Sequence, residues 1–346
     1  MRVVAAMSGG VDSSVVAGLL KEQGHEVIGI HMKLHDVEEG EAGHCCGLDD
    51  AMDARMVADA LEIPFYVMDL REAFKKAVMD DFAENYRAGR TPNPCVRCNG
   101  VLKFRVLLQR AKALGASHLA TGHYAKVTPE GGLYRAVDHH KDQSYFLFPA
   151  TRDAFAQTLF PLGGMTKPEV RAHAERLGLV TSSKPDSQEV CFIPDDDHTR
   201  FVREHLGDPD ASGDIVDEDG TVLGQHDGYF RYTVGQRRGL GIAAGYPLYV
   251  LKIQAASKRI VVGPADRLME QGLVASGMNW FREPTNGEEI FARIRHNGGL
   301  IPATIEGTEP TTVHFQAPAR AIAPGQAVVL YSGDEVLGGG WIERAL

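Results

Sequence analysis

The sequence has no long hydrophobic run. None of its apolar stretches approaches the ~20 residues that a helix needs to span a bilayer. The first residues, Met1 to Met7, are typical of a short strand that runs into a glycine loop, and they are too few for the core of a signal peptide. We therefore expect a cytoplasmic protein with no membrane partner.

Cysteine is scarce and unevenly placed. The five cysteines form the adjacent pair Cys45 and Cys46, the Cys95-x-x-Cys98 pair and the single Cys191. An odd count in three separate places does not resemble the disulfide framework of a secreted protein. Thiol or metal chemistry is the better interpretation, and we derive no role for Cys45 and Cys46.

Positive charge is in deficit, with 36 Lys and Arg against 46 Asp and Glu and a net charge of −10. This excludes a protein coated in positive charge but not a local basic face. One stretch, residues 87–112, has no acidic residue and seven basic ones: Arg87, Arg90, Arg97, Lys103, Arg105, Arg110 and Lys112. Any one of them could lie on a solvated helix face, but together they favour a polyanionic substrate such as RNA.

The remaining composition is that of a globular protein. Apolar residues make up 44% and charged residues 24% of the 346 residues, which rules out wholesale disorder, a coiled coil and a collagen-like fibre. At ~100 to 200 residues per domain, the length predicts two or three domains.

Strands and helices alternate in the first part of the chain. The patterns predict strands over 3–7, 27–32, 65–68 and 119–121, and helices over 12–22, 49–62, 71–86 and 103–114. This order predicts an α/β fold with a parallel sheet, whose ligands lie at the carboxyl ends of the strands. We also expect a hairpin over 124–137 and a helix that begins at Thr166 and ends near Leu177.

Past about residue 195 the pattern becomes mostly β. One short helix over 199–206 precedes glycine-punctuated strand patterns, and the expected strands are 213–216, 220–223, those within 246–262, 290–294, 312–315 and 327–331. The last of these suggest a small β-barrel. We expect three domains, over 1–197, 198–272 and 273–346.

The segment Ser8-Gly9-Gly10-Val11-Asp12-Ser13-Ser14 lies between a buried strand and a helix. Glycines let a backbone approach a phosphate, and a helix N-terminus and hydroxyl groups supply hydrogen-bond donors. A tight turn with a good cap is the alternative. The loop contains no lysine, and both the Gly-x-x-x-x-Gly-Lys and the Gly-x-Gly-x-x-Gly patterns are absent, which disfavours a kinase, a GTPase and a dinucleotide-binding fold.

The second informative segment is Thr91-Pro92-Asn93-Pro94-Cys95-Val96-Arg97-Cys98-Asn99. Its prolines predict a rigid loop, and Arg97 is expected to favour the thiolate form of the neighbouring cysteines. A structural zinc site is the alternative, but no second Cys-x-x-Cys or spaced His pair supports it.

The Ser8 to Ser13 motif resembles the signature of the ATP pyrophosphatases, the PP-loop superfamily. Further segments extend the resemblance in order along nearly the whole chain to the tRNA-specific 2-thiouridylase family. They are residues 91–99, 120–124, 141–147, 186–193, 235–241 and 324–326. The resemblance implies a Rossmann-like ATP-pyrophosphatase domain over 1–197, a central, mostly β, tRNA-contacting domain over 198–272 and a C-terminal β-barrel over 273–346.

The resemblance also implies roles for single residues. Cys98 corresponds to the family's nucleophile, Cys191 to the cysteine that carries a persulfide, and Asp12 to a catalytic carboxylate. The ATP-binding residues would be Ala6, Met7, Ser8, Gly9, Gly10, Val11, Asp12, Ser13, Met32 and Gly122. Asn93, Pro94 and Cys95 would meet the target base, and His123, Lys141, Asp142, Gln143, Arg295, His296 and Gln326 would contact tRNA.

The implied reaction uses ATP with Mg²⁺ to adenylate the C2 oxygen of a wobble uridine, and a persulfide then delivers sulfur with release of AMP. Cys95 stands where a common form of the motif has Asp, so a 4Fe-4S cluster on Cys95, Cys98 and Cys191 is an alternative sulfur route. The expected partners are tRNAs for Lys, Glu and Gln and a cysteine desulfurase or sulfur carrier. An amide-forming ligase of the same superfamily and a non-catalytic tRNA-binding protein are the rival functions.

Overall fold

The computed structural model describes residues 1–36, 48–186, 190–193, 195, 197–207 and 209–346. Cys45 and Cys46 therefore lie outside the described residues. The chain divides into two compact units, which we describe separately. Unit 1 comprises Met1–Val78, Cys95–Asp196 and Asp334–Val336, and unit 2 comprises Met79–Pro94, Asp197–Gly333 and Leu337–Leu346.

A parallel five-stranded sheet organises unit 1, in the order β3-β2-β1-β4-β7. Its strands are β1 (Arg2–Ala6), β2 (Glu26–Lys33), β3 (Phe65–Asp69), β4 (His118–Ala120) and β7 (Thr158–Leu159). Val3 to Ala5 of the central strand β1 are fully buried. Their apolar side chains suit a parallel strand that is covered on both faces. The sheet confirms the predicted α/β fold, although β7 was not predicted.

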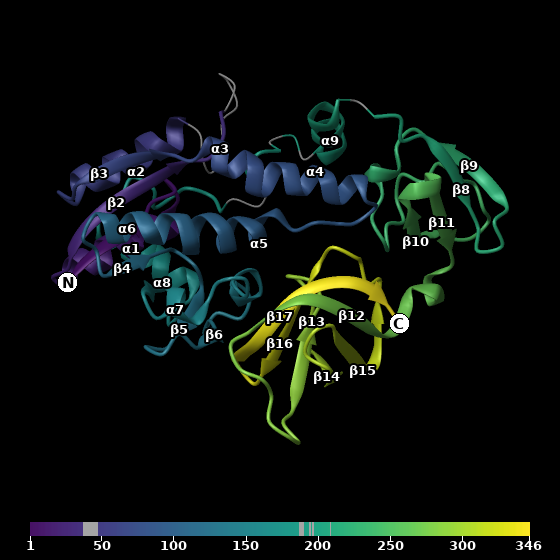
Figure 1. Cartoon of the computed structure of the whole chain (residues 1–346). Helices are drawn as coiled ribbons and strands as arrows, with labels where there is room; N and C mark the ends of the chain where they lie inside the picture. The colour runs from purple at the N-terminus through teal and green to yellow at the C-terminus, as the bar shows by residue number, and fades with distance from the viewer. Residues whose placement is uncertain (37–47, 187–189, 194, 196, 208) are drawn as a thin grey trace. The chain divides into compact units, whose positions relative to one another are not determined.

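Helices lie beside the strands of this sheet (Figure 1). Those of unit 1 are α1 (Val11–Glu22), α2 (Leu48–Ala60), α3 (Arg71–Phe74), α5 (Pro94–Cys98), α6 (Leu108–Ala113), α7 (Arg152–Phe155) and α8 (Lys167–Arg176), with π-helices over Lys75–Met79 and Asn99–Leu107 and a 3₁₀ turn over Ser144–Phe146. One buried apolar cluster joins β1, α1, α2 and α8. The predicted cap of α8 is confirmed, since Thr166 N donates to Glu169 Oε2 at 2.7 Å.

The predicted hairpin is also present in unit 1. Strands β5 (Ala125–Val127) and β6 (Leu133–Arg135) pair antiparallel. Gly131, at the turn, has a φ of +79°, in the left-handed region. It has no room for a side chain, because an added Cβ would lie 2.0 Å from the carbonyl oxygen of Arg152.

One local prediction is wrong. The segment around the Cys-x-x-Cys pair is not a loop throughout, because Pro94–Cys98 is helical and a π-helix continues from it over Asn99–Leu107. Proline fits the first turn of a helix, where its missing N–H costs no hydrogen bond. The predicted helix over 103–114 therefore begins nine residues earlier, at Pro94.

Unit 2 holds a mixed four-stranded sheet and a closed barrel. The sheet has the order β10-β11-β8-β9, formed by β8 (Gly213–Val216), β9 (Val222–His226), β10 (Tyr249–Gln254) and β11 (Arg259–Gly263). The helical segments of this unit are α4 (Asp80–Arg87), α9 (His198–Leu206) and 3₁₀ turns over Tyr229–Arg231, Ala255–Ser257 and Ala265–Leu268.

The barrel confirms the predicted C-terminal β-fold. Its order is β12-β15-β14-β13-β16-β17, and β12 also pairs with β17, which closes the sheet. The strands are β12 (Met269–Trp280), β13 (Ile290–Arg293), β14 (Ile301–Glu306), β15 (Thr311–Arg320), β16 (Ala327–Ser332) and β17 (Glu335–Ala345). The domain boundaries at 197/198 and 272/273 stay predictions. Among the described residues, no helix combines the length and the apolar character required to cross a bilayer.

Candidate functional site

The glycine-serine loop connects β1 to α1 in unit 1, as the sequence predicted. Gly9 has a φ of +81° and packs against α2, where an added Cβ would lie 2.3 Å from the carbonyl oxygen of Asp50. The hydroxyls of Ser13 and Ser14 donate to the carbonyl oxygen of Gly10 at 3.1 and 2.9 Å, and Ser8 N donates to Ser13 Oγ at 3.1 Å. These bonds hold the loop in a fixed shape at the start of α1.

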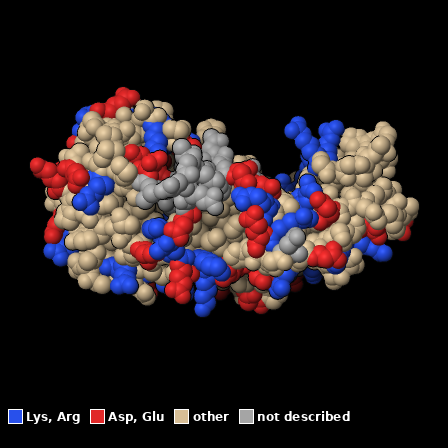
Figure 2. Space-filling view, turned by 90° about the horizontal axis from the view of Figure 1, so that it is seen from above, with Lys and Arg blue, Asp and Glu red and all other residues tan. Residues whose placement is uncertain are grey.

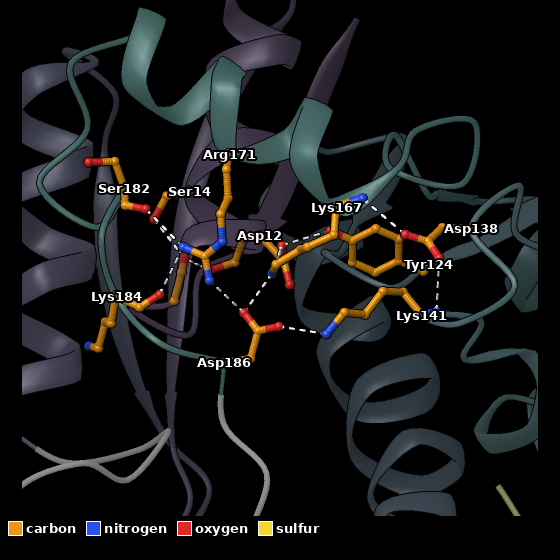
Figure 3. A network of polar contacts seen from close by, with 12 residues as sticks. Asp12, Ser14, Tyr124, Asp138, Lys141, Lys167, Arg171, Ser182, Lys184 and Asp186 are labelled. Atoms are coloured by element: carbon orange, nitrogen blue, oxygen red, sulfur yellow. Dashed lines mark hydrogen bonds and ion pairs between the residues drawn. The ribbon is translucent and has the colours of Figure 1, made fainter. Parts of the chain in front are cut away.

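Asp12 forms the centre of a network of charged groups at this loop (Figure 3). Lys167 Nζ, from the first turn of α8, lies 2.7 Å from Asp12 Oδ1 and 2.8 Å from Asp186 Oδ1. The Lys167 side chain is only 10% exposed. A buried ammonium group is thus shared between the loop and the segment that leads to Cys191.

Asp186 forms ion pairs with three basic side chains. Besides Lys167, it pairs with Lys141 at 2.7 Å and with Arg171 of α8 at 3.1 Å. Burial alone would raise the pKa of Asp186, but hydrogen bonds from Lys141 and Lys167 hold it at about 2. The carboxylate is therefore ionised at neutral pH.

A second lysine approaches the loop from the same stretch of chain. Lys184 Nζ donates to the carbonyl oxygen of Gly9 at 3.1 Å and to carboxylates of Asp50 and Asp53 on α2 at 2.6 and 2.5 Å. Burial acts to lower the pKa of Lys184, but the two carboxylates raise it above its ordinary value. The loop lacks a lysine in sequence, yet the fold brings two to it.

The segment after β4 lies against the loop. An added Cβ on Gly122 would lie 3.0 Å from the backbone nitrogen of Ser13 and 3.2 Å from Asp12 Cβ. Tyr124 donates its hydroxyl to Asp12 Oδ1 at 3.0 Å, and its pKa is raised by burial and by that carboxylate. The predicted ATP-binding residue Gly122 thus has its place beside the start of α1.

His123 lies in the same segment and is buried. Its Nδ1 shares a hydrogen bond of 2.7 Å with Thr121 Oγ1, and its Nε2 lies 3.4 Å from Lys103 Nζ. Burial and the charge of Lys103 hold the pKa of His123 well below its usual range, so the imidazole is neutral at pH 7. The predicted contact of His123 with tRNA stays a prediction.

The predicted tRNA-contacting residues Lys141, Asp142 and Gln143 have different environments. Lys141 is part of the Asp186 network, and Gln143 Oε1 accepts a hydrogen bond from Tyr124 N at 3.0 Å. Asp142 is buried and accepts hydrogen bonds from the backbone of Ala136 and from Ser144. The buried Asp142 carboxylate thus links the backbone at Ala136 to Ser144 through hydrogen bonds.

Among the described cysteines, Cys95 is exposed, Cys98 is buried and Cys191 has an intermediate exposure. Burial raises the pKa of Cys98 and the charge of Lys103 lowers it only in part. The prediction that Arg97 favours a thiolate is therefore wrong for Cys98. Helix α5 turns this side chain into an apolar interior, where the charged form is disfavoured.

Asn93 and Pro94 end the first segment of unit 2, and Gln326 supports the residues before them. Gln326 Nε2 donates to the carbonyl oxygens of Thr91 at 2.9 Å and Pro92 at 3.3 Å. The predicted residues Arg295 and His296 follow β13, and Arg295 donates to the carbonyl oxygen of Ala321. Gln326 thus positions this segment through its backbone.

The basic stripe of residues 87–112 is partly neutralised. Arg87 pairs with Glu84 at 2.5 Å, and Arg90 pairs with Glu343 at 2.9 Å. Both acidic residues lie outside residues 87–112, the stretch that contains basic residues but no acidic ones. Figure 2 shows basic and acidic side chains interspersed over the face in view.

Sequence reasoning missed Lys167, Lys184, Arg171 and the pairing role of Asp186. Lys167 follows Thr166 at the helix start that the sequence identified, and Asp186 begins a motif segment, so both positions were visible. What the sequence does not contain is the distance to Asp12, which depends on the packing of α8 against α1.

Comparisons with known proteins match three consecutive stretches of the chain to family models. Residues 1–195 match the family described as the tRNA methyl transferase HUP domain. Residues 199–264 match the tRNA methyl transferase PRC-barrel domain, and residues 270–342 the aminomethyltransferase β-barrel domain.

Full-length relatives carry the name tRNA-specific 2-thiouridylase MnmA. One from Geotalea uraniireducens (strain Rf4) is 54% identical over 358 residues, covering 100% of this chain and 96% of the relative. One from Geobacter metallireducens is 52% identical, covering 100% and 97%. One from Carboxydothermus hydrogenoformans is 48% identical, covering 100% and 98%. Because about half of the residues are shared along the whole length, from the glycine-serine loop through the barrel, the chain belongs to the tRNA-specific 2-thiouridylase family.

Proposed function

We propose that this enzyme is an ATP-dependent tRNA sulfurtransferase that converts the wobble uridine of tRNA to 2-thiouridine, releasing AMP and pyrophosphate. The observation that supports it best is the convergence of Lys167 and Lys184 on the loop of Asp12. This arrangement places two buried or half-buried cations where a triphosphate would meet a glycine-rich helix N-terminus.

The first half of the reaction needs charge compensation at the phosphates. The C2 oxygen of uracil is a poor leaving group, so its attack on the α-phosphate of ATP, with departure of pyrophosphate, makes it a good one. In our proposal Lys167 and Lys184 exchange their carboxylate partners for phosphate oxygens, and Lys167 stabilises the charge that develops on the leaving pyrophosphate. Mg²⁺ would supply further neutralisation, and Asp12 is the carboxylate placed to hold it at the loop.

The second half moves one sulfur atom. The terminal sulfur of a Cys191 persulfide attacks C2 and AMP leaves, which joins Cys191 to the base through two sulfurs. Cys98 then attacks Cys191 Sγ, a Cys98–Cys191 disulfide forms, and the base departs as 2-thiouridine with the outer sulfur. A thiol reductant must reduce that disulfide before the next turnover.

Burial has a consequence for Cys98 in this scheme. Its raised pKa keeps the thiol protonated in the described conformation. The attack on Cys191 therefore needs either a proton acceptor at Cys98 or entry of water and substrate that lowers this pKa. Lys103, whose charge already acts in that direction, is the described cation that would favour the thiolate.

The alternative 4Fe-4S route requires three cysteines in one place. Among the described residues, which include Cys95, Cys98 and Cys191, no three His, Cys, Asp or Glu side chains are gathered as metal ligands would be. The arrangement does not fit a cluster, so we derive no step through one.

The proposal also includes the tRNA substrates and the protein that donates sulfur. The family likeness supports tRNAs for Lys, Glu and Gln as substrates, and a cysteine desulfurase or sulfur carrier as the donor that charges Cys191. The segment of Asn93, Pro94 and Cys95 would meet the target base, flipped out of the anticodon loop. Such a reaction takes place in the cytoplasm, where tRNA and reductant are present.

The test is a thiolation assay on protein purified without oxygen, with its iron content measured. Anticodon-loop tRNA, ATP and a persulfide donor are supplied, and 2-thiouridine and pyrophosphate are quantified separately by mass spectrometry and a coupled assay. We expect Cys98→Ala and Cys191→Ala to abolish 2-thiouridine while pyrophosphate release on tRNA continues. Cys95→Ala removes the third cysteine that the cluster alternative requires, and it should still form 2-thiouridine.

Other results would contradict the proposal in different ways. Iron-dependent activity that is lost in all three variants would replace the persulfide with a cluster. Unchanged pyrophosphate release on a small-molecule acceptor, with no 2-thiouridine in any assay, would indicate an amide-forming ligase. Binding of tRNA without any pyrophosphate release would leave only a tRNA-binding protein.

A further inference from the structure

A long part of unit 2 has no acidic residue. From Gly228 to Ala265 the chain contains no Asp or Glu, although the whole protein carries a net charge of −10. The same stretch holds six basic residues: Arg231, Arg237, Arg238, Lys252, Lys258 and Arg259. This local excess of positive charge lies outside the residues 87–112 discussed above.

Two of these six cations are already neutralised. Arg231 pairs with Asp227 at 2.6 Å, and Lys258 pairs with Asp210 at 2.7 Å. Across the described ranges of the chain, no acidic side chain pairs with Arg237 or Arg238, and both side chains are exposed. Two adjacent guanidinium groups are thus available to an anion from outside.

The turn that carries the two arginines is held in place. Gln236 Nε2 donates to the carbonyl oxygen of Arg238 at 2.9 Å, while Gln236 Oε1 accepts from Thr233 N at 3.0 Å. Gly235 N donates to Val250 O at 2.8 Å, and Val250 N donates to Gln236 O at 2.9 Å. This double pairing fixes the backbone against β10, so little ordering is needed when a ligand binds.

An open hollow of about 470 Å³ lies beside this turn and is lined in part by Arg237. Its apolar lining includes Leu240 and Leu248, which are buried, and Tyr246, which is 61% exposed. The volume falls within the ~300–1,000 Å³ of small-molecule sites. An exposed aromatic ring in the same hollow as the cationic Arg237 is an arrangement on which a nucleic-acid base stacks while a phosphate is neutralised.

We infer that the turn of Arg237 and Arg238 and the hollow beside it form a second RNA-binding site, which takes one unpaired nucleotide of the tRNA substrate. The guanidinium groups bind the phosphodiester, and Tyr246 stacks on the base. The inference rests on the proposed function, because it assumes that tRNA is the substrate. It adds a contact that is independent of the target base and of the predicted residues Lys141 to Gln143, Arg295, His296 and Gln326.

The site favours RNA over an acidic protein for two reasons. Guanidinium groups offer planar forks of donors that match phosphate geometry, and a ring face accepts any base. Arg237 lines the hollow together with the exposed ring of Tyr246, so that a cation and an aromatic ring belong to one site. Stacking and phosphate binding together are a requirement of nucleotides and not of acidic side chains.

The experiment measures binding of the full-length protein to an in vitro transcribed tRNA for Lys, across a range of salt concentrations. The variants are R237A/R238A, Tyr246→Ala and Tyr246→Phe. The matched control K252A/R259A removes two exposed, unpaired positive charges from β10 and β11 of the same acid-free segment. Thermal unfolding of each variant checks that it is folded.

We expect R237A/R238A to weaken binding by ~10-fold or more at low salt and to reduce the slope of log K against log salt by ~1 to 2. Tyr246→Ala should weaken binding by ~5- to 100-fold with an unchanged slope, and Tyr246→Phe should bind as the wild type does. The control should lose less than the arginine pair. Release of pyrophosphate at saturating tRNA should continue in every variant.

The outcomes separate this inference from the proposed function. A wild-type protein that binds no tRNA contradicts the proposed function itself. Wild-type affinity and salt slope in R237A/R238A, with tRNA binding intact, overturn the second site alone. Equal losses in R237A/R238A and K252A/R259A also overturn it, because the effect would then come from net charge and not from the site.

Discussion

Lys167→Met is the substitution that most directly tests the assigned site. Methionine keeps most of the length and apolar contact of the lysine stem but removes the ammonium group. In the wild type that group lies 2.7 Å from Asp12 and 2.8 Å from Asp186, and the Lys167 side chain is nearly buried. The variant therefore leaves two carboxylates facing each other without their shared cation.

The cost to stability can be worked from Asp186. A fall of its pKa from 3.8 to about 2 corresponds to about 2 kcal/mol of favourable interaction with the ionised form, at about 1.4 kcal/mol per tenfold change. Lys141 and Arg171 also pair with this carboxylate. With the interaction divided among these cations, the share of Lys167 at Asp186 is about 1 kcal/mol.

The sign of the pH dependence follows from the same pKa. A carboxyl whose pKa is lower in the folded protein contributes stability above its unfolded pKa, and this contribution is lost as the pH falls from about 4 toward 2. Removal of Lys167 raises the pKa of Asp186 toward its ordinary value. The destabilisation of Lys167→Met should thus be full at pH 6 and smaller at pH 3.

The effect on catalysis should exceed the effect on folding. If Lys167 stabilises the charge on the departing pyrophosphate, its loss should slow pyrophosphate release by ~100- to 1,000-fold at saturating ATP and tRNA. Stability is measured by urea unfolding at the two pH values, and the control is Lys112→Met on an exposed part of α6. Pyrophosphate release within a few-fold of wild type in Lys167→Met would refute the assignment of this lysine.

Three further predictions concern other parts of the site. Gly122→Ala should weaken binding of a non-hydrolysable ATP analogue by ~10-fold, measured by calorimetry, because its Cβ would lie 3.0 Å from the Ser13 nitrogen and must displace the loop. Iodoacetamide should label exposed Cys95 well before buried Cys98 in peptide mass spectra, and labelling of Cys98 should still be rising above pH ~9, since burial raises its pKa; equal rates would contradict the described burial. Gln326→Ala should lower thiolation by ~3- to 10-fold and leave ATP affinity unchanged, because it removes only the hydrogen bonds to the backbone before Asn93.

The sequence was sufficient for most of the fold of unit 1. Strand β1 is a short apolar run between Arg2 and the glycine-serine loop, with Val3 to Ala5 buried, and α8 opens with a capping threonine and a proline. Both elements therefore have strong local signals. Strand β7 has only two residues, Thr158 and Leu159, which is too few for any periodicity. The prediction of a loop for the cysteine segment is wrong because Pro94 begins α5, and proline suits the first turn of a helix as well as a loop.

The candidate site likewise contains residues that the sequence could predict and residues that it could not. Asp12, Ser13 and Gly122 could be predicted because their local motifs place them at the end of a strand. Lys167 and Lys184 could not, since only the packing of distant segments brings them to the loop. The protonation of Cys98 could not be predicted either, because it depends on burial of the side chain, which raises the pKa more than the charge of Lys103 lowers it.

The path of the chain between the two units constrains how the protein can be made. Unit 1 receives its last residues, Asp334–Val336, only after strands β12 to β16 have been synthesised. There Glu335 pairs with Tyr134 of β6, and Arg135 N donates to Asp334 O at 2.9 Å. A nascent chain therefore cannot complete its N-terminal unit on the ribosome before the barrel strands have been translated. A C-terminal truncation designed to isolate the ATP-binding half would lack this closing segment.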